Sequence, residues 1–294
     1  MGAAMRRLIG AVVPALLAAP AWAHDSGTPH EEPPGWTLDP GIIVPLLVAL
    51  LLFMVGWRRL ARRSGQGMER WGRNARLFGT GWLILGIALL SPLHEAGERS
   101  FAAHMFEHEV IMLVAAPLLV LPRPLPVMLW AFPAAGRRAI GRLVASPAVA
   151  VPWRTLSAPF AATLVQAAAL WLWHAPALFD LALAHDGWHA AQHLSFLVSA
   201  LFFWSAMLGR HTAAGTAALC LVATSIVSGA LGALMAFATS PWYAGYARLG
   251  LAPWGLTPAE DQQLAGLLMW VPGGLVHAGA ALIVMRRLLR TAHG

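Results

Sequence analysis

Seven long runs of apolar residues constrain the fold of this chain more than any other feature. The runs are about 17 to 27 residues long, enough for helices to cross a hydrocarbon core of roughly 30 Å. Only 11% of the 294 residues are charged, whereas a soluble domain has about 25%. Strand-like alternation is absent, which argues against a membrane β-barrel. We therefore predict an all-α, polytopic protein with seven transmembrane helices. They are expected at Gly41–Trp57, Leu77–Leu93, Phe101–Leu121, Pro159–His174, His189–Leu208, Ala213–Thr239 and Leu264–Met285.

Residues 1–23 have the features of a signal peptide. Arg6 and Arg7 precede an apolar stretch that ends near Ala19, and Ala21-Trp22-Ala23 forms a small-residue cleavage pattern. Cleavage after Ala23 would leave a polar, non-cytoplasmic tail at 24–39, followed by a membrane domain at 40–290. The alternative is that the segment stays uncleaved as an additional first helix.

The basic residues predict the orientation of the helices. All 20 are arginine, and they gather in the loops after the first and third segments and behind the seventh. Arg99 and Arg248 are the only arginines in the opposite loops of the predicted membrane domain. Arginine in short loops stays cytoplasmic, so we predict an N-terminus out, C-terminus in arrangement in a bacterial inner membrane. The positive charge is then suited to anionic lipid, and no nucleic-acid partner is implied.

Histidines gather toward the predicted outer face. His104 and His108 are four residues apart, as are His189 and His193, so each pair shares one helix face. His174 ends the fourth segment on the same side, and His185 lies in the loop after it. His94 is interpreted as a loop residue that could capture metal. His277, deep in the last segment, is interpreted as a packing residue.

This arrangement predicts a metal site. Paired imidazoles on two helices can hold copper, zinc or iron, and a thioether favours Cu(I). Met105 is an auxiliary ligand candidate, and Met112 continues the face of the first pair by the next step of four. Glu107 and Asp180 could orient ligands. The single cysteine excludes a cysteine-based zinc site, and ordinary hydrogen-bonding histidines remain the alternative.

Four ordered motifs resemble the CtaG family, whose members assemble caa-type cytochrome c oxidase in bacterial membranes. The motifs are HMFEH at 104–108, WHAP at 173–176, HAAQH at 189–193 and DQQLAGLLMW at 261–270. The resemblance implies a non-catalytic role in oxidase maturation, with delivery or insertion of copper as the expected task. Hydrolase, ATPase and zincin motifs are absent, which agrees with that role.

We therefore predict a metallochaperone that binds copper, expected as Cu(I), and passes it to an oxidase subunit. The copper would come from the periplasmic side, where a donor protein could supply it. The candidate ligands are His104, His108, His174, His189 and His193, with His185 and Met105 as auxiliaries. The alternatives are a haem-binding electron-transfer protein, a copper or proton-coupled transporter, and a scaffold without metal. Asp261, Gln262 and Gln263 are expected to cap the last helix or to contact a partner.

Overall fold

The computed structural model describes residues 34–63, 68–209, 211–252 and 254–292, and this part of the chain is helical without strands. The predicted signal peptide at 1–23 and most of the tail at 24–39 lie outside the described residues. The end of the tail is held to the bundle, since Thr37 N donates to Leu90 O at 3.0 Å. The first described helix, α2 (Pro40–Arg63), begins directly after it.

Five helical segments are long and apolar enough to cross a membrane: α2, Phe101–Val120, α12 (Asp186–Leu208), α13 (Ala214–Ala236) and α15 (Pro258–Ala292, spanning to Arg286). Two bent pairs raise the number to seven when each pair is one span. The first joins α3 (Met68–Leu90) to α4 (Pro92–Arg99) through a 45° bend, and the second joins α9 (Pro147–Leu156) to α10 (Pro159–Trp173) through 77°. The prediction of an all-helical, multi-pass membrane protein is confirmed.

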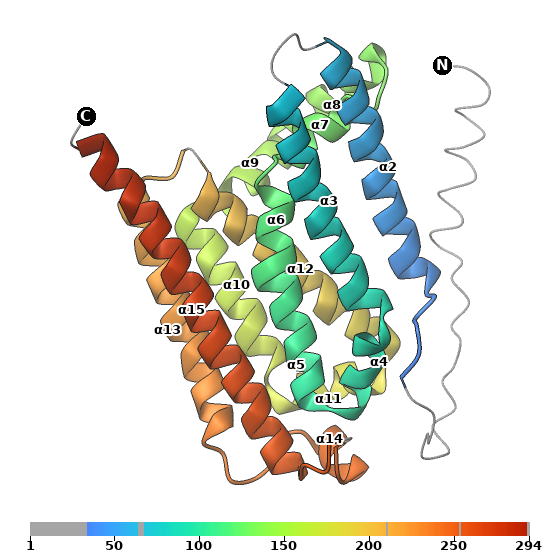
Figure 1. Cartoon of the computed structure of the whole chain (residues 1–294), viewed down its shortest axis with the longest axis vertical. Helices are drawn as coiled ribbons and strands as arrows, with labels where there is room; N and C mark the ends of the chain where they lie inside the picture. Colours follow the sequence, from blue (N-terminus) through green and yellow to red (C-terminus); the bar gives the residue numbers. More distant parts are fainter. Residues whose placement is uncertain (1–33, 64–67, 210, 253, 293–294) are drawn as a thin grey trace.

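Short helices lie at both ends of the bundle (Figure 1). One end carries α7 (Pro124–Leu129), α8 (Ala134–Ala145) and α9, which lie between the third and fourth predicted segments. We call it the arginine end, because Arg59, Arg63 and Arg137 all contact Trp130 or its neighbour Ala131 there. The opposite end carries α4, α11 (Pro176–Ala184) and α14 (Ala244–Leu249). It also holds the paired histidines, and we call it the histidine end.

The core lies between α5 (Phe101–Glu109), α12, α13 and α15, and large apolar side chains such as Leu164 and Leu275 face outward. Outward apolar side chains suit lipid, which solvates them without cost. The helices α13 and α15 pack closely against each other. A Cβ added to Gly266 would lie 2.5 Å from both Gly232 O and Ala236 N, so only glycine permits this approach.

A π-helical turn, η1 (Val110–Ala115), interrupts the third span between α5 and α6 (Ala116–Val120). A π turn places an extra residue in the helix, and it therefore rotates the later turns of the span relative to the earlier ones. The Trp204 indole stabilises the turn by donating to Met112 O at 2.8 Å. Met112 lies within this turn and lines a separate inner cavity.

Candidate metal centre

The helix that carries the first histidine pair is capped from a distant part of the chain. Asp261, near the start of α15, accepts hydrogen bonds from Ser100 Oγ at 2.8 Å, Phe101 N at 2.6 Å and Ala102 N at 3.4 Å. These groups form the N-terminus of α5, where unpaired N–H groups and the helix dipole favour a carboxylate. Asp261 thus caps α5, whereas the sequence suggested a cap on its own helix. It fixes the start of α5 one turn before His104.

The next two residues of the same motif hold the neighbouring loop. Gln262 Oε1 accepts from Trp242 N at 2.6 Å, and Gln263 Nε2 donates to Ala238 O at 2.8 Å. Asp180 has a similar structural role, since its carboxylate accepts from Gly245 N at 2.9 Å at the start of α14. Asp180 therefore holds α14, in place of the predicted role in orienting a ligand.

Two buried tyrosines tie the short helices to the spans. Tyr246 Oη donates to Gly97 O at 2.5 Å, and Tyr243 Oη donates to His174 O at 3.1 Å. Burial raises the pKa of the Tyr246 hydroxyl well above its usual value, so this group stays protonated and remains a donor. Tyr246 in this way holds α4 against α14, next to the histidines.

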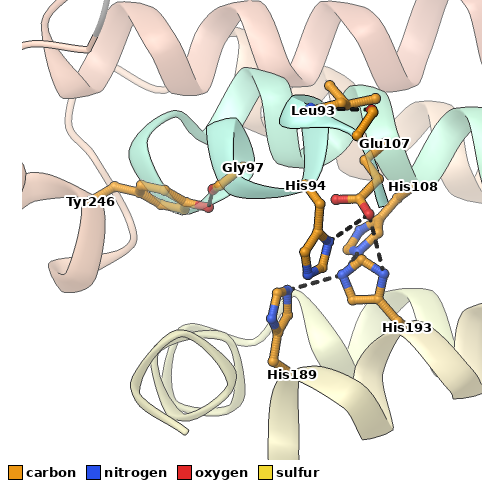
Figure 2. A network of polar contacts seen from close by, with 9 residues as sticks. Leu93, His94, Gly97, Glu107, His108, His189, His193 and Tyr246 are labelled. Carbon is orange, nitrogen blue, oxygen red and sulfur yellow. Dashed lines mark hydrogen bonds and ion pairs between the residues drawn. The ribbon is translucent and has the colours of Figure 1, made fainter. Parts of the chain in front are cut away.

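Three imidazoles from two helices converge at this end (Figure 2). His193 Nε2 lies 2.9 Å from His189 Nε2 and 3.3 Å from His108 Nε2. His104 joins them, because ring nitrogens of His104, His189 and His193 all lie within 4.8 Å of one another. His104, His108 and His193 are buried. The two predicted pairs therefore form a single group, which we call the histidine cluster.

Hydrogen bonding alone does not satisfy the histidine cluster. A single ring nitrogen either carries one hydrogen or offers one lone pair, so His193 Nε2 can make only one of its two contacts as a well-directed hydrogen bond. His104 Nε2, His108 Nδ1 and His193 Nδ1 have no hydrogen-bond partner among the described residues. Two nitrogen ligands, each about 2.0 Å from a tetrahedral ion, are roughly 3.3 Å apart. The two spacings at His193 Nε2 are therefore close to that of two ligands around one metal ion.

His94 and Glu107 form a second group with His193. His94 Nδ1 lies 2.9 Å from Glu107 Oε1, and His193 Nδ1 lies 3.8 Å from the same oxygen. Figure 2 shows His94 pointing from α4 into the cluster. The sequence placed His94 in a loop. The missed signal is Ser91-Pro92, because a serine N-cap followed by proline starts a new helix. That helix folds back along α5 and brings His94 inward.

His174 lies apart from the cluster with Met105. His174 Nδ1 is 2.7 Å from Leu170 O, and a carbonyl can only accept, so Nδ1 carries the hydrogen and Nε2 of the neutral ring has a lone pair. This Nε2 is 3.2 Å from Met105 Sδ, which has no hydrogen to donate. Two lone pairs therefore face each other, as two ligands of a metal ion would. Phe179 packs between this pair and His104, with ring centroids 6.0 Å from His174 and 5.3 Å from His104.

The remaining predicted ligand, His185, is exposed at the N-cap of α12 and belongs to neither group. His277 is buried, donates from Nδ1 to Gly273 O at 2.8 Å and stacks on Trp204 with ring centroids 5.8 Å apart. The predicted packing role thus agrees with its surroundings. One of its ring nitrogens, Nε2, has no hydrogen-bond partner among the described residues.

The sequence profile of the family described as cytochrome c oxidase caa3 assembly factor (Caa3_CtaG) matches residues 51–291. The chain belongs to this family. The match covers the helices that carry the histidine cluster, His94 and the His174–Met105 pair, and it confirms the resemblance seen in the four motifs. A search of the curated proteins and of the solved structures finds no significant match.

Proposed function

We propose that this member of the caa3 assembly factor family binds one copper ion, as Cu(I), at the histidine cluster and delivers it to a subunit of cytochrome c oxidase. The observation that carries the proposal is that His193 Nε2 lies 2.9 Å from His189 Nε2 and 3.3 Å from His108 Nε2 in a buried site, two contacts that hydrogen bonds do not both satisfy. The ligands would be His104, His108, His189 and His193.

The charge of the site favours a monovalent ion. Glu107 is fully buried and is the one carboxylate in the two metal-binding groups of the described residues. When the imidazoles around it, His94 included, bind metal as neutral ligands, a single positive charge balances this carboxylate. Imidazole with a nearby thioether is a donor set that suits Cu(I).

The His174–Met105 pair could accept the ion when it leaves the histidine cluster. Its nitrogen and sulfur atoms lie 3.2 Å apart behind Phe179 and offer a second, softer set of ligands. An ion delivered to a partner has to be bound by ligands that exchange, and two adjacent sets with few ligands each allow stepwise exchange. His185 is exposed, and we leave it out of the proposed ligand set.

The proposed orientation of the protein in the membrane depends on the positions of the arginines. Because Arg59, Arg63 and Arg137 all lie at the arginine end, the positive-inside rule puts that end in the cytoplasm. The histidine end then faces the periplasm of a bacterial inner membrane, where a copper donor and the oxidase subunit could reach it. No catalytic step is needed for this role.

A bis-histidine haem is the less favoured alternative. Two axial nitrogens on one iron would be roughly 4 Å apart, twice a metal–nitrogen bond of about 2.0 Å, with the macrocycle between them. The cluster nitrogens lie closer, at 2.9 and 3.3 Å, and Phe196 packs on His108 with ring centroids 4.7 Å apart.

Metal analysis of the purified full chain tests the proposal. We expect the wild type to retain Cu(I), and the His104→Ala/His108→Ala variant to lose the ion held at the cluster. His211→Ala, which removes an exposed histidine, is the matched control and should bind copper like the wild type. No copper above background in the wild type would defeat the metallochaperone role. Normal oxidase assembly in cells that carry the double variant would show that the cluster is not needed for delivery.

A further inference from the structure

A second group of polar residues lies inside the bundle, between α5, α10, α13 and α15. A cavity of about 20 Å³ is lined by Glu109, Gln166, Thr224, Ser228 and His277, together with Met112 and apolar neighbours. Gln166 lies midway along α10, and Thr224 lies near the middle of α13. Polar side chains in the middle of membrane spans are costly and generally mark function.

Three of the groups that line the cavity donate their hydrogens to backbone carbonyls. Thr224 Oγ1 donates to Cys220 O at 2.9 Å, and Ser228 Oγ donates to Thr224 O at 2.8 Å. His277 Nδ1 donates to Gly273 O at 2.8 Å, which leaves Nε2 of the neutral ring as an acceptor. These groups therefore present acceptors, as do the side-chain oxygens Glu109 Oε2 and Gln166 Oε1.

Three of these acceptors have no partner among the described residues: Glu109 Oε2, Gln166 Oε1 and His277 Nε2. Gln166 is 3% exposed and His277 is 2% exposed, so bulk water does not solvate them. The cavity has room for one water-sized species. A cation of that size would be attracted by all three acceptors at once.

We propose that this cavity is a second binding site for one dehydrated Cu(I) ion, deeper in the bundle than the histidine cluster. The inference rests on the proposed function for the identity of the ion. The lining residues include one carboxylate, Glu109, and no cationic side chain, so a monovalent ion balances the charge. The imidazole of His277 and the thioether of Met112 favour copper over an alkali cation, which prefers oxygen ligands.

The π turn connects the two sites. Glu109 comes directly after His108 in the chain, and η1 begins at the next residue, Val110. Met112 lies within η1 and lines the inner cavity, while His104 and His108 belong to the histidine cluster. An ion could therefore move from the cluster to the inner site along one span.

Anaerobic titration of the full chain with Cu(I), in competition with a chromophoric chelator, tests the inner site. We expect two tight equivalents for the wild type, one for His104→Ala/His108→Ala and one for Glu109→Gln/His277→Gln. Glu260→Gln removes an exposed carboxylate at the start of the same α15 helix and should keep both equivalents. Retention of the outer equivalent in the Glu109→Gln/His277→Gln variant shows that this variant is folded.

One equivalent in the wild type that Glu109→Gln/His277→Gln leaves intact would overturn the inner site and leave the proposed function standing. One equivalent that only Glu109→Gln/His277→Gln removes would support the inner site and overturn the role of the cluster. If that variant loses both equivalents, copper X-ray absorption of the His104→Ala/His108→Ala background decides. Loss of a sulfur scatterer on adding Met112→Leu supports the inner site, and an unchanged spectrum overturns it.

Discussion

The two ends of the bundle use polar side chains in opposite ways. At the arginine end, Arg59 reaches outward along the surface and donates to Ala131 O at 2.8 Å, and Arg137 stacks on Trp130 at 4.2 Å from the ring centroid. At the histidine end, His104, His108 and His193 are buried against one another. The arginine end thus keeps its charged groups exposed, whereas the histidine end buries its ring nitrogens.

This difference indicates which end is built for a ligand. An exposed arginine that contacts a carbonyl costs little to hold, and its loss is tolerated because water replaces the contact. Buried ring nitrogens without hydrogen-bond partners cost stability unless something binds them. We therefore expect substitutions at the histidine end to have large effects on metal binding or folding, and those at the arginine end to have small ones.

The largest effect is expected for His193→Ala. Nε2 of His193 contacts both His189 and His108. His193 also belongs to both groups that could hold a metal ion, the one with His104 and His189 and the one with His94 and Glu107. Loss of residues that only support a metal ligand weakens binding by about 10- to 100-fold, so loss of the shared ligand should weaken Cu(I) binding by more than about 100-fold. Competition titration measures the change. His185→Ala is the control on the same end, and a loss of affinity there equal to that of His193→Ala would contradict the geometry.

A second effect is expected from Asp261→Asn, which acts on folding. The carboxylate accepts from Ser100 Oγ and from Phe101 N at the start of α5. Hydrogen bonds to a charged group contribute about 1.5 to 3 kcal/mol each, and the amide keeps part of this because it can still accept. We expect a loss of about 2 kcal/mol in unfolding free energy, measured by denaturation in detergent. Glu260→Gln at the exposed start of the same α15 helix should change it by much less.

A smaller effect is expected for Tyr246→Phe. The substitution removes one neutral hydrogen bond to Gly97 O and leaves the buried ring in place. The expected loss is about 1 kcal/mol in unfolding free energy. Because α4 carries His94, we expect the Cu(I) affinity of this variant to fall by a few-fold as well. Unchanged affinity together with lowered stability would show that α4 keeps its position without this bond.

Much of the fold could be predicted from the apolar runs, and the exceptions have local causes. The run at 77–93 predicts one straight helix, but Ser91-Pro92 ends α3 at Leu90 and starts α4. A 3.6-residue period predicts an uninterrupted helix through Met112, whereas the structure has a π turn there and Met112 lines the inner cavity. Such a turn depends on contacts from another helix, including the bond from Trp204, and the local sequence does not specify it.

The candidate site was predictable only where its residues share one helix. Four-residue spacing identified the pairs His104/His108 and His189/His193, because helical geometry alone puts each pair on one face. His94 joined the site through a tertiary contact, the fold-back of α4 on α5. The role of Asp261 also depends on tertiary structure, since it acts on α5 from about 160 residues away in the chain.

The smallest effect is expected for Arg59→Gln at the arginine end. The side chain is exposed and its carbonyl contacts, Trp130 O at 3.3 Å and Ala131 O at 2.8 Å, can be replaced by water. We expect a change within about 0.5 kcal/mol in unfolding free energy and no change in Cu(I) affinity. The same measurement on Arg59→Gln and Asp261→Asn compares an exposed with a buried polar contact directly. A loss at Arg59 as large as that at Asp261 would mean that the arginine end is also held by polar bonds, and the contrast between the two ends would then concern ligand binding alone.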